Sequence, residues 1–355
     1  MIWVILFLAT ILRLVNINQS LWLDEASQAI MSQKFISYII FERSGDFHPP
    51  LSYILFHFWM MLGTSEIWLR ILPVIFGVAT VFIIYKISQK LFNQKIAMIS
   101  AALLATAPYH IYYSQEIRMY SFVLFFASLS MYYFLTNKKV GYIIGASLLL
   151  YTHYMGVFLL VAQLLYKKNW KLVGLVFLAF IPWLPFFWQQ LSSGINANQY
   201  LPGWGALLSL DPIKALPLIF IKFSIGRVSF EPPILYAIIS AVVFGFFGFL
   251  IFKSIKSDNI KPILVWFFIP ILLVWLVSFM FPMDQPFRLL FCLPAFYILL
   301  SVGAGQLGRF WRLGVLGVVF ISISGLLVYW TNPKFQREDW KKATREIPQN
   351  AVFAW

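Results

Sequence analysis

Long apolar runs separated by short polar stretches dominate the chain. A helix needs about 20 mostly apolar residues to cross a bilayer, and such runs recur as far as residue 331. Residues 141–167 fit two short helices or one long helix, so we expect ten or eleven spans in an all-α polytopic membrane protein. The predicted spans are 1–16, 67–88, 96–114, 120–136, 141–153, 155–167, 170–189, 233–253, 262–281, 287–307 and 312–331.

A short amphipathic stretch follows the first span. From Leu21 onward, apolar residues recur at helical spacing, and polar residues share another face. The pattern predicts an interfacial helix in a long first outer loop, with Ser20 as its N-cap. Adjacent carboxylates, Asp24 and Glu25, lie near the start of this helix. They either carry chemistry at the membrane edge or occupy a position that the helix dipole favours for acids, and the local pattern leaves both readings open.

The composition supports the membrane assignment. Hydrophobic residues make up 61% of the chain and charged residues 11%, whereas soluble domains have about 25% charged residues. The single Cys292 excludes an intrachain disulfide. The first segment has no basic n-region and no small-residue cleavage site, so we expect it to be a retained span.

Charge is distributed unequally between the two predicted sides. The net charge is +14, but the basic residues gather in short loops on one side, where Asp258 is the only acid. By the positive-inside rule that side is cytoplasmic, which accounts for the basic pI without a nucleic-acid partner. The long loops, 17–66 and 190–232, then lie outside, where we expect the functional site. The acids on that side are Asp24, Glu25, Glu42, Asp46, Glu66, Glu116, Asp211, Glu231 and Asp284.

Polar clusters mark the ends of several outer segments. Besides Asp24-Glu25, they are Asp46-Phe-His-Pro-Pro50, Tyr112-Tyr-Ser-Gln-Glu-Ile-Arg-Met-Tyr120, Pro286-Phe-Arg288 and, more weakly, His153-Tyr154. Two prolines after His48 fix the start of the next helix. On one continuous helix, Glu116 and Arg118 would point to opposite faces, so they converge only if the helix ends near Ser114.

Each of these clusters also has a structural interpretation. His48 fits a simple interfacial histidine. Glu116 and Arg118 fit a local ion pair between two spans. A lone arginine at a helix end, such as Arg288, often only extends its charged group to the interface.

Six segments, in order, resemble the membrane glycosyltransferases of the RgtA/B/C/D-like group. That group is related to the protein O-mannosyltransferases and to the lipid A aminoarabinose transferase, and all share the GT-C fold. The match is dense over residues 20–155 and thinner afterwards. The segments are "LWLDEA", "HPPLSYILFHFWMMLG", "SEIWLRILPVIFG", "YHIYYSQEIRMYS", "LYTHYMG" and "FRLLFCLPAF".

The resemblance implies a sugar donor on a polyprenyl phosphate, used on the outer face of the cytoplasmic membrane. It maps the family's catalytic acid of the first loop onto Asp24. It also implies a catalytic domain at 1–331, with 332–355 as the start of a short or truncated outer segment. Where some relatives have an acid and a lysine, this chain has His48 and Pro49, which leaves open both a metal site and the residue that holds the donor phosphate.

The chemistry of glycosyl transfer fits these residue types. It needs a base for the acceptor hydroxyl and cations for the departing phosphate. Asp24 and Glu25 are the expected catalytic residues, with Asp24 as the base. Arg118 and Arg288 are suited to bind phosphate, because guanidinium pairs with phosphate oxygens bidentately. Tyr120 and His153 complete the expected substrate-binding set.

A divalent metal ion is an open question. Glu25, His48 and Glu116 are the candidate ligands, and the same residues could instead orient the acceptor. The expected partners are the lipid-linked donor, a lipid, glycan or protein acceptor, and the bilayer. We find no Gly-rich phosphate loop that would bind a nucleotide sugar.

Two other classes remain as alternatives. A transporter or flippase of lipid-linked sugars would place ionisable residues near the bilayer midplane, whereas here the charges cluster at the outer edge. A scaffold with a degenerate site is the third reading. The preferred function is therefore a polyprenyl-phosphate-dependent glycosyltransferase that acts outside the membrane.

Overall fold

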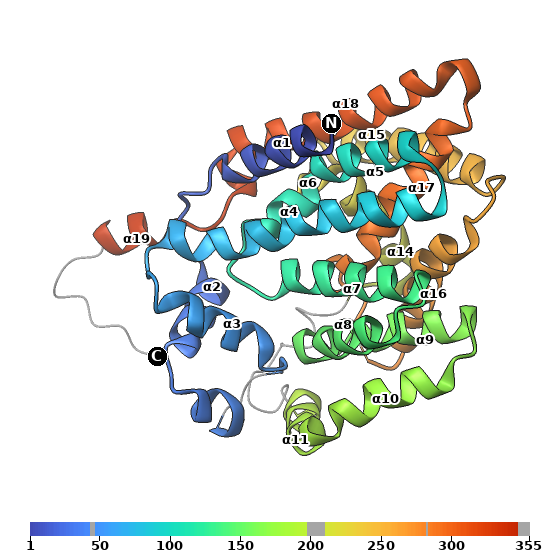
Figure 1. The fold of residues 1–355 in the computed structure, drawn as a ribbon. Helices are drawn as coiled ribbons and strands as arrows, with labels where there is room; N and C mark the ends of the chain where they lie inside the picture. The colour runs from blue at the N-terminus through green and yellow to red at the C-terminus, as the bar shows by residue number, and fades with distance from the viewer. Residues whose placement is uncertain (43–46, 197–209, 282, 347–355) are drawn as a thin grey trace.

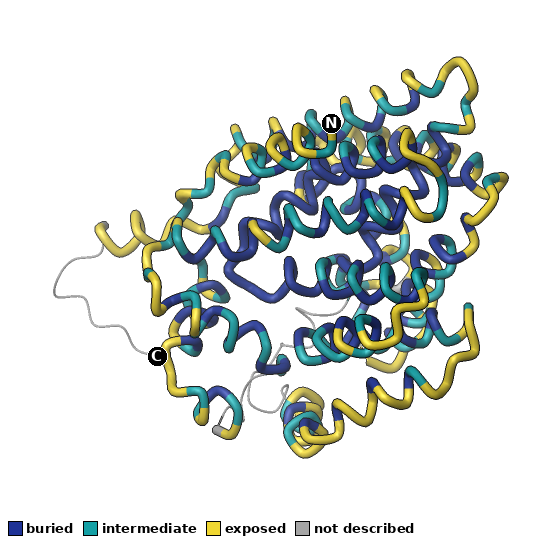
Figure 2. The backbone as a smooth tube through the Cα atoms, in the orientation of Figure 1, coloured by how far each residue is buried: buried dark blue, intermediate teal, exposed yellow. Residues whose placement is uncertain are grey.

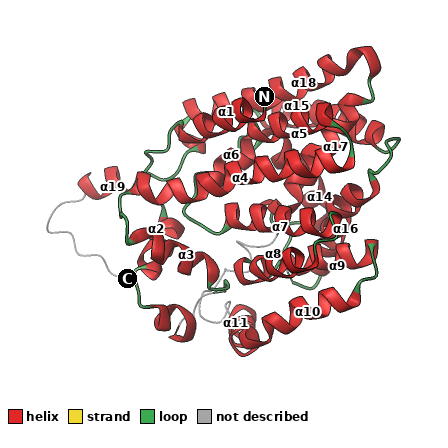
Figure 3. Cartoon of the chain, viewed as in Figure 1, coloured by secondary structure: helices red, strands yellow, loops and turns green. Residues whose placement is uncertain are grey.

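The computed structural model describes residues 1–42, 47–196, 210–281 and 283–346, and the described part is built of helices and loops (Figures 1 and 3). The first half contains α1 (Ile2–Leu14), α2 (Leu23–Ser32), η1 (Tyr38–Glu42), α3 (Leu51–Met60), α4 (Glu66–Leu91), α5 (Gln94–Ala105), α6 (Pro108–Ser114), α7 (Tyr120–Leu135), α8 (Lys139–Thr152) and α9 (Gly156–Tyr166). The second half contains α10 (Trp170–Phe180), η2 (Ile181–Trp183), α11 (Leu184–Ile195), α14 (Pro212–Ile225), α15 (Pro233–Ser254), α16 (Lys261–Ser278), η3 (Pro286–Cys292), α17 (Leu293–Gly305), η4 (Gly308–Phe310), α18 (Trp311–Thr331), η5 (Pro333–Phe335) and α19 (Trp340–Glu346).

The all-helical class is confirmed. Within the described residues, six helices are long and apolar enough to cross a membrane, or seven if the bent pair α5 and α6 forms one span. Five shorter apolar helices accompany them: α1, α3, α7, α8 and α9. The total of ten or eleven spans therefore stays a prediction. The ambiguous region 141–167 forms two short helices, α8 and α9.

Helix α14 was not predicted. Residues 212–225, which we expected to lie in an outer loop, form α14. This helix has 14 residues and contains Pro217 and Lys222, so it is too short and too interrupted for a window of about 20 apolar residues. Asp211 caps its first turn, because its Oδ1 accepts a hydrogen bond from the Ile213 amide at 3.0 Å.

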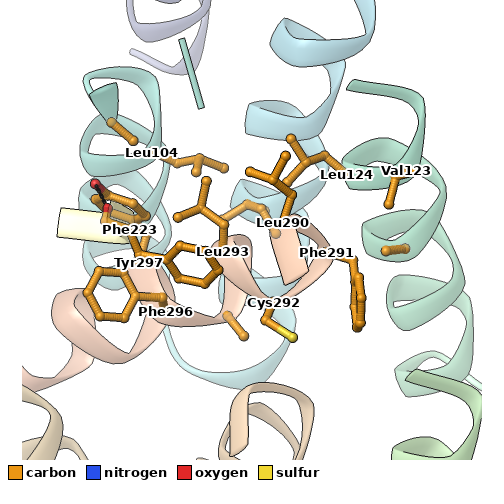
Figure 4. Close-up of a cluster of buried hydrophobic side chains, with 14 of the residues drawn as sticks. Leu104, Val123, Leu124, Phe223, Leu290, Phe291, Cys292, Leu293, Phe296 and Tyr297 are labelled. Carbon is orange, nitrogen blue, oxygen red and sulfur yellow. Dashed lines mark hydrogen bonds between the residues drawn. The ribbon is translucent and has the colours of Figure 1, made fainter. Parts of the chain in front are cut away.

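The core is centred on α17, whose residues from Leu293 to Ala304 are buried. Figure 4 shows side chains of η3 and α17 packed against residues of α5, α7 and α14. The neighbouring helix α15 approaches so closely that a Cβ at Gly303 would lie 1.9 Å from the Leu250 carbonyl oxygen. Only glycine permits this contact.

The outward faces of the peripheral helices are apolar. Figure 2 shows exposed residues along α10 and α18, and large hydrophobic side chains are exposed on α1, α10, α15 and α18. A soluble protein rarely leaves such extensive apolar surface in water. These faces are suited to contact lipid.

A buried arginine lies where the α5–α6 span breaks. The two helices meet at an angle of 61°, and Pro108 occupies the first turn of α6. Arg13 of α1 is fully buried there. Its Nη1 donates to the Ala9 and Ala105 carbonyls at 2.8 and 3.1 Å, and its Nη2 is hydrogen-bonded to His110 Nδ1. The guanidinium thus binds a carbonyl group that the break leaves without a helical partner.

Candidate active site

In the polar cluster at 112–120 the helix ends before Glu116, which is the condition for Glu116 and Arg118 to point to the same site. Helix α6 ends at Ser114 and α7 begins at Tyr120, so residues 115–119 are not helical. Glu116 and Arg118 therefore need not point in opposite directions, as they would on one continuous helix. Gln115 anchors this linker to the end of α1, because its Nε2 donates to the Arg13 and Val15 carbonyls at 2.9 and 2.6 Å.

The loop between α1 and α2 is held by Arg70 of α4, whose side chain is fully buried. The Arg70 guanidinium donates to the Ile17, Gln19 and Ser20 carbonyls. The predicted N-cap is wrong: α2 begins at Leu23, Trp22 occupies the N-cap position, and no side chain caps the helix. The carbonyl of Ser20 is bound to Arg70, and its Oγ accepts a hydrogen bond from the Lys341 amide at 3.2 Å.

Glu25 lies between two arginines. Its Oε2 pairs with Arg70 Nη2 at 2.6 Å, and its Oε1 pairs with Arg337 Nε at 3.2 Å. Oε1 also accepts a hydrogen bond from the Ile117 amide at 3.0 Å. All three ionic side chains are at most 1% exposed. Both oxygens of Glu25 are thereby engaged by protein groups.

Asp24, the residue before Glu25, is open to the surroundings. Its Oδ2 lies 3.8 Å from Arg118 Nη2, and its side chain is 42% exposed, whereas that of Arg118 is 9% exposed. Adjacent carboxylates thus have different environments. Asp24 is accessible beside a buried guanidinium, and Glu25 is enclosed.

Burial raises the pKa of Glu116 to about 7. The positive charges of Arg337, Arg227 and Arg118 oppose this rise, while the charge of Glu25 adds to it. Glu116 is 1% exposed, and its Oε2 has no hydrogen-bond partner among the described residues. The Glu116 carboxyl can therefore hold or release a proton near neutral pH.

The raised pKa of Glu116 predicts a pH-dependent stability. Between pH 4.5, its ordinary value, and about 7, the unfolded chain releases this proton and the folded chain keeps it. The contribution of Glu116 to the free energy of unfolding is therefore full below pH 4.5 and is lost as the pH rises through 7. The total loss is roughly 3 kcal/mol. Glu116→Gln should remove this decline in a series of melting temperatures from pH 4.5 to 8. Parallel profiles of wild type and variant would contradict the assignment.

Arg288 belongs to η3, which packs beside the start of α7. Phe287 packs against Tyr120 with ring centroids 5.8 Å apart, which joins the start of α7 to η3. The guanidinium of Arg288 lies 5.8 Å from the Phe287 ring. Asp284, just before η3, is buried, and its carboxylate has no hydrogen-bond partner among the described residues.

The two candidate histidines lie together. The rings of His48 and His153 have centroids 5.9 Å apart. His153 lies at the C-terminal end of α8. Its Nδ1 accepts a hydrogen bond from the Met155 amide at 3.1 Å, so the proton is on Nε2, which can act as a donor.

The candidate metal ligands do not converge. In the described ranges, no group of three His, Cys, Asp or Glu side chains could hold a metal ion. Glu25 is already engaged by two arginines. Asp46 of the second polar cluster lies outside the described residues.

Three arginines of the site were missed by the sequence reading. Arg70 and Arg337 bind Glu25, as described above. Arg227, which follows α14, donates to the Tyr112 hydroxyl and lies 4.7 Å from its ring centre, while Arg337 lies at 4.8 Å. The rarity of acids in the sequence was the signal that could have indicated these arginines, because a buried Glu25 needs cationic partners. The pattern does not say which cations they are.

A comparison with protein families matches part of the chain. Residues 47–188, less than half of the chain, match the family described as dolichyl-phosphate-mannose-protein mannosyltransferase. This segment begins just before His48 and includes Arg70, Glu116, Arg118 and His153. No curated protein sequence matches the chain significantly.

Solved structures share the fold at low sequence identity. ArnT from Cupriavidus metallidurans bound to undecaprenyl phosphate is 15% identical with a TM-score of 0.62, over 98% of this chain and 65% of that one. Apo ArnT has a TM-score of 0.61 at 14% identity, over 95% and 64%. AglB, the oligosaccharyltransferase from Archaeoglobus fulgidus, in complex with an inhibitory peptide and a dolichol-phosphate, has a TM-score of 0.57 at 12% identity, over 98% and 58%.

These matches cover almost all of this chain. Conversely, the chain spans less than two thirds of the length of ArnT. The apolar helices, the matched segment and the shared architecture agree with one another. They confirm the resemblance inferred from the sequence, and they identify the chain as a multi-pass membrane protein with the GT-C glycosyltransferase fold.

Proposed function

We propose that this protein transfers a sugar from a polyprenyl-phosphate donor to an acceptor hydroxyl at the outer face of the cytoplasmic membrane. The observation that carries the proposal is the exposed carboxylate of Asp24, 3.8 Å from the buried guanidinium of Arg118. A candidate base and a candidate cation for the phosphate thus lie side by side, and the reaction requires both.

Asp24 acts as the general base in this proposal. The carboxylate takes the acceptor proton as the hydroxyl oxygen forms its bond to the anomeric carbon, while the bond from that carbon to the phosphate oxygen breaks. The exposure of Asp24 supports this role, because an acceptor can reach its oxygens. Glu25 lacks that access, so we assign it a positioning role.

Arg118 and Arg288 bind the departing phosphate in this proposal. Arg118 is largely buried, so its charge acts in a region of low dielectric, where electrostatic interactions are strong. The contact between Tyr120 and Phe287 brings the two arginine-bearing segments together. His153, with its proton on Nε2, adds a hydrogen-bond donor, and His48 lies beside it.

The structural relatives support a lipid-linked donor. ArnT has been solved with undecaprenyl phosphate and AglB with a dolichol-phosphate. Both ligands carry a phosphate on a polyprenyl chain. For this chain, a lipid, glycan or protein acceptor is consistent with the proposal, and Glu116 is a candidate to orient it.

The direct experiment is an assay of donor cleavage. Purified protein in lipid nanodiscs would be incubated with a panel of polyprenyl-phosphate sugars and candidate acceptors. Release of polyprenyl phosphate together with a glycosylated acceptor would support the proposal. Failure of every donor to bind or to be cleaved would contradict it.

Replacing Arg118 or Arg288 by alanine should weaken binding of undecaprenyl phosphate by about 10- to 100-fold, because each loses charge-assisted hydrogen bonds. Lysine should restore only part of the affinity, since it cannot form a bidentate pair. Isothermal titration in nanodiscs measures this effect. Arg309→Ala, in η4 after α17, is the matched control and should bind normally. Normal binding in both site variants would show that the arginines are structural.

A further inference from the structure

The chain returns to the loop between α1 and α2 after its last long helix. Following α18, η5 leads into residues 336–339 and then α19, which lies beside the start of α4 (Figure 1). Lys341 of α19 makes two contacts with earlier parts of the chain. Its side chain pairs with Glu66 at the start of α4, and its amide donates a hydrogen bond to Ser20 Oγ in the loop before α2 at 3.2 Å. We call residues 333–346 the return segment.

Arg337 is the buried residue of the return segment. Its amide donates to Gln19 Oε1 at 3.0 Å, its Nη2 donates to the Tyr112 carbonyl at 3.3 Å, and its guanidinium lies over the Tyr112 ring. Its Nε lies 3.2 Å from Glu25 Oε1, an ion pair without hydrogen-bond geometry. The side chain is 1% exposed. One arginine therefore binds both the loop between α1 and α2 and the 112–120 cluster.

Charge neutralisation alone does not require Arg337. Arg70 already pairs with Glu25 at 2.6 Å, and that pair is fully buried. A second buried arginine on the same carboxylate carries a further desolvation cost. Its specific contribution is geometric, because it reaches Oε1, the oxygen that also accepts the Ile117 amide.

The position of Glu25 determines that of Asp24. The two residues are adjacent in the first turn of α2, and the loop before α2 is not helical. Ile117, which donates to Glu25, directly precedes Arg118, the partner of Asp24. The Glu25 carboxylate thus links the two segments that carry the proposed base and the proposed phosphate-binding arginine.

We infer that Arg337 is a positioning residue, which holds Glu25 against Ile117 and thereby sets the placement of Asp24 relative to Arg118. This inference rests on the proposed function. Arg337 is too deeply buried to touch substrate, so it acts through Glu25. The return segment is accordingly part of the active site, although it lies beyond the predicted catalytic domain at 1–331.

The test compares Arg337→Gln, Arg337→Lys and Lys334→Gln in the full chain in nanodiscs. Lys334 is the matched control, because it is another cation of the return segment and pairs with Glu231 at the exposed surface. Arg337→Gln should lower kcat by about 10- to 100-fold, since displacement of a reacting group by about 1 Å has effects of this size. Affinity for undecaprenyl phosphate should stay within about threefold. Lysine should recover only part of kcat, because it cannot bind Glu25 and Tyr112 with one planar group.

Hydrogen exchange supplies a readout that does not need turnover. In Arg337→Gln, peptides covering residues 15–26 should exchange faster, while those of α7 and α17 should be unchanged. Loss of donor affinity equal to the loss of kcat, an equal effect of Lys334→Gln, or unchanged exchange and turnover would each overturn the inference. If wild-type protein shows no transferase activity, the proposed function fails, and the exchange data alone decide whether Arg337 orders the loop between α1 and α2.

Discussion

Replacing Asp24 by asparagine is expected to lower turnover by about 10²–10⁴-fold, the usual contribution of a positioned general base. Asparagine keeps the shape of the side chain but cannot accept the acceptor proton. Because Asp24 is 42% exposed and lies 3.8 Å from Arg118, the variant should fold and bind donor. Single-turnover rates, undecaprenyl-phosphate affinity and melting temperature, measured on the same preparation, separate these effects.

A structural role for Asp24 makes the opposite prediction. If the carboxylate only favours the start of α2 through the helix dipole, Asp24→Asn costs at most about 1 kcal/mol of stability and leaves turnover intact. Glu231→Gln is a suitable control, since Glu231 pairs only with the exposed Lys334 among the ion pairs of the described residues. Near-normal turnover in Asp24→Asn would remove the base assignment.

Glu25→Gln is expected to affect stability more than any other single change at the site. The substitution removes the charge that compensates two buried arginines, Arg70 and Arg337. Breaking a buried ion pair by removing one partner typically costs about 3–5 kcal/mol. Melting temperatures in detergent, followed by tryptophan fluorescence, measure this cost.

The matched comparison again uses Glu231. Its carboxylate and Lys334 are exposed, and pairs of this kind contribute little, so Glu231→Gln should leave the melting temperature unchanged. If Glu25→Gln melted like the wild type and lost only turnover, Glu25 would be a catalytic group, and the positioning role would be wrong.

Much of the fold was predictable because lipid imposes strong constraints on sequence. Helices that cross a bilayer must be long and apolar, and this requirement located α4, α15, α16 and α18. Local signals also worked: Pro49 and Pro50 precede α3, and α6 ends at Ser114. The criterion failed for α14, which has only 14 residues. The N-cap prediction failed because backbone contacts from Arg70 fix the loop around Ser20.

The partners of the site were less predictable than its carboxylates. Asp24 and Glu25 stood out as scarce acids beside an apolar segment. Their separation into an accessible and an enclosed carboxylate depends on Arg70, Ile117 and Arg337, which come from three distant parts of the chain. One sequence contains no signal for such long-range pairing.

The buried contact between Arg13 and the broken span has a consequence for biogenesis. Arg13 lies in the last turn of α1, where the insertion cost is smaller than the cost of about 2.5–3.5 kcal/mol for an arginine at the helix centre, but burial of its charge still needs polar partners. Arg13 meets the Ala105 carbonyl and His110 only in the assembled bundle, after more than ninety further residues have been synthesised. During synthesis, α1 thus leaves the ribosome long before the polar partners of Arg13. We therefore expect α1 to become stably enclosed only late, when α5 and α6 pack beside it.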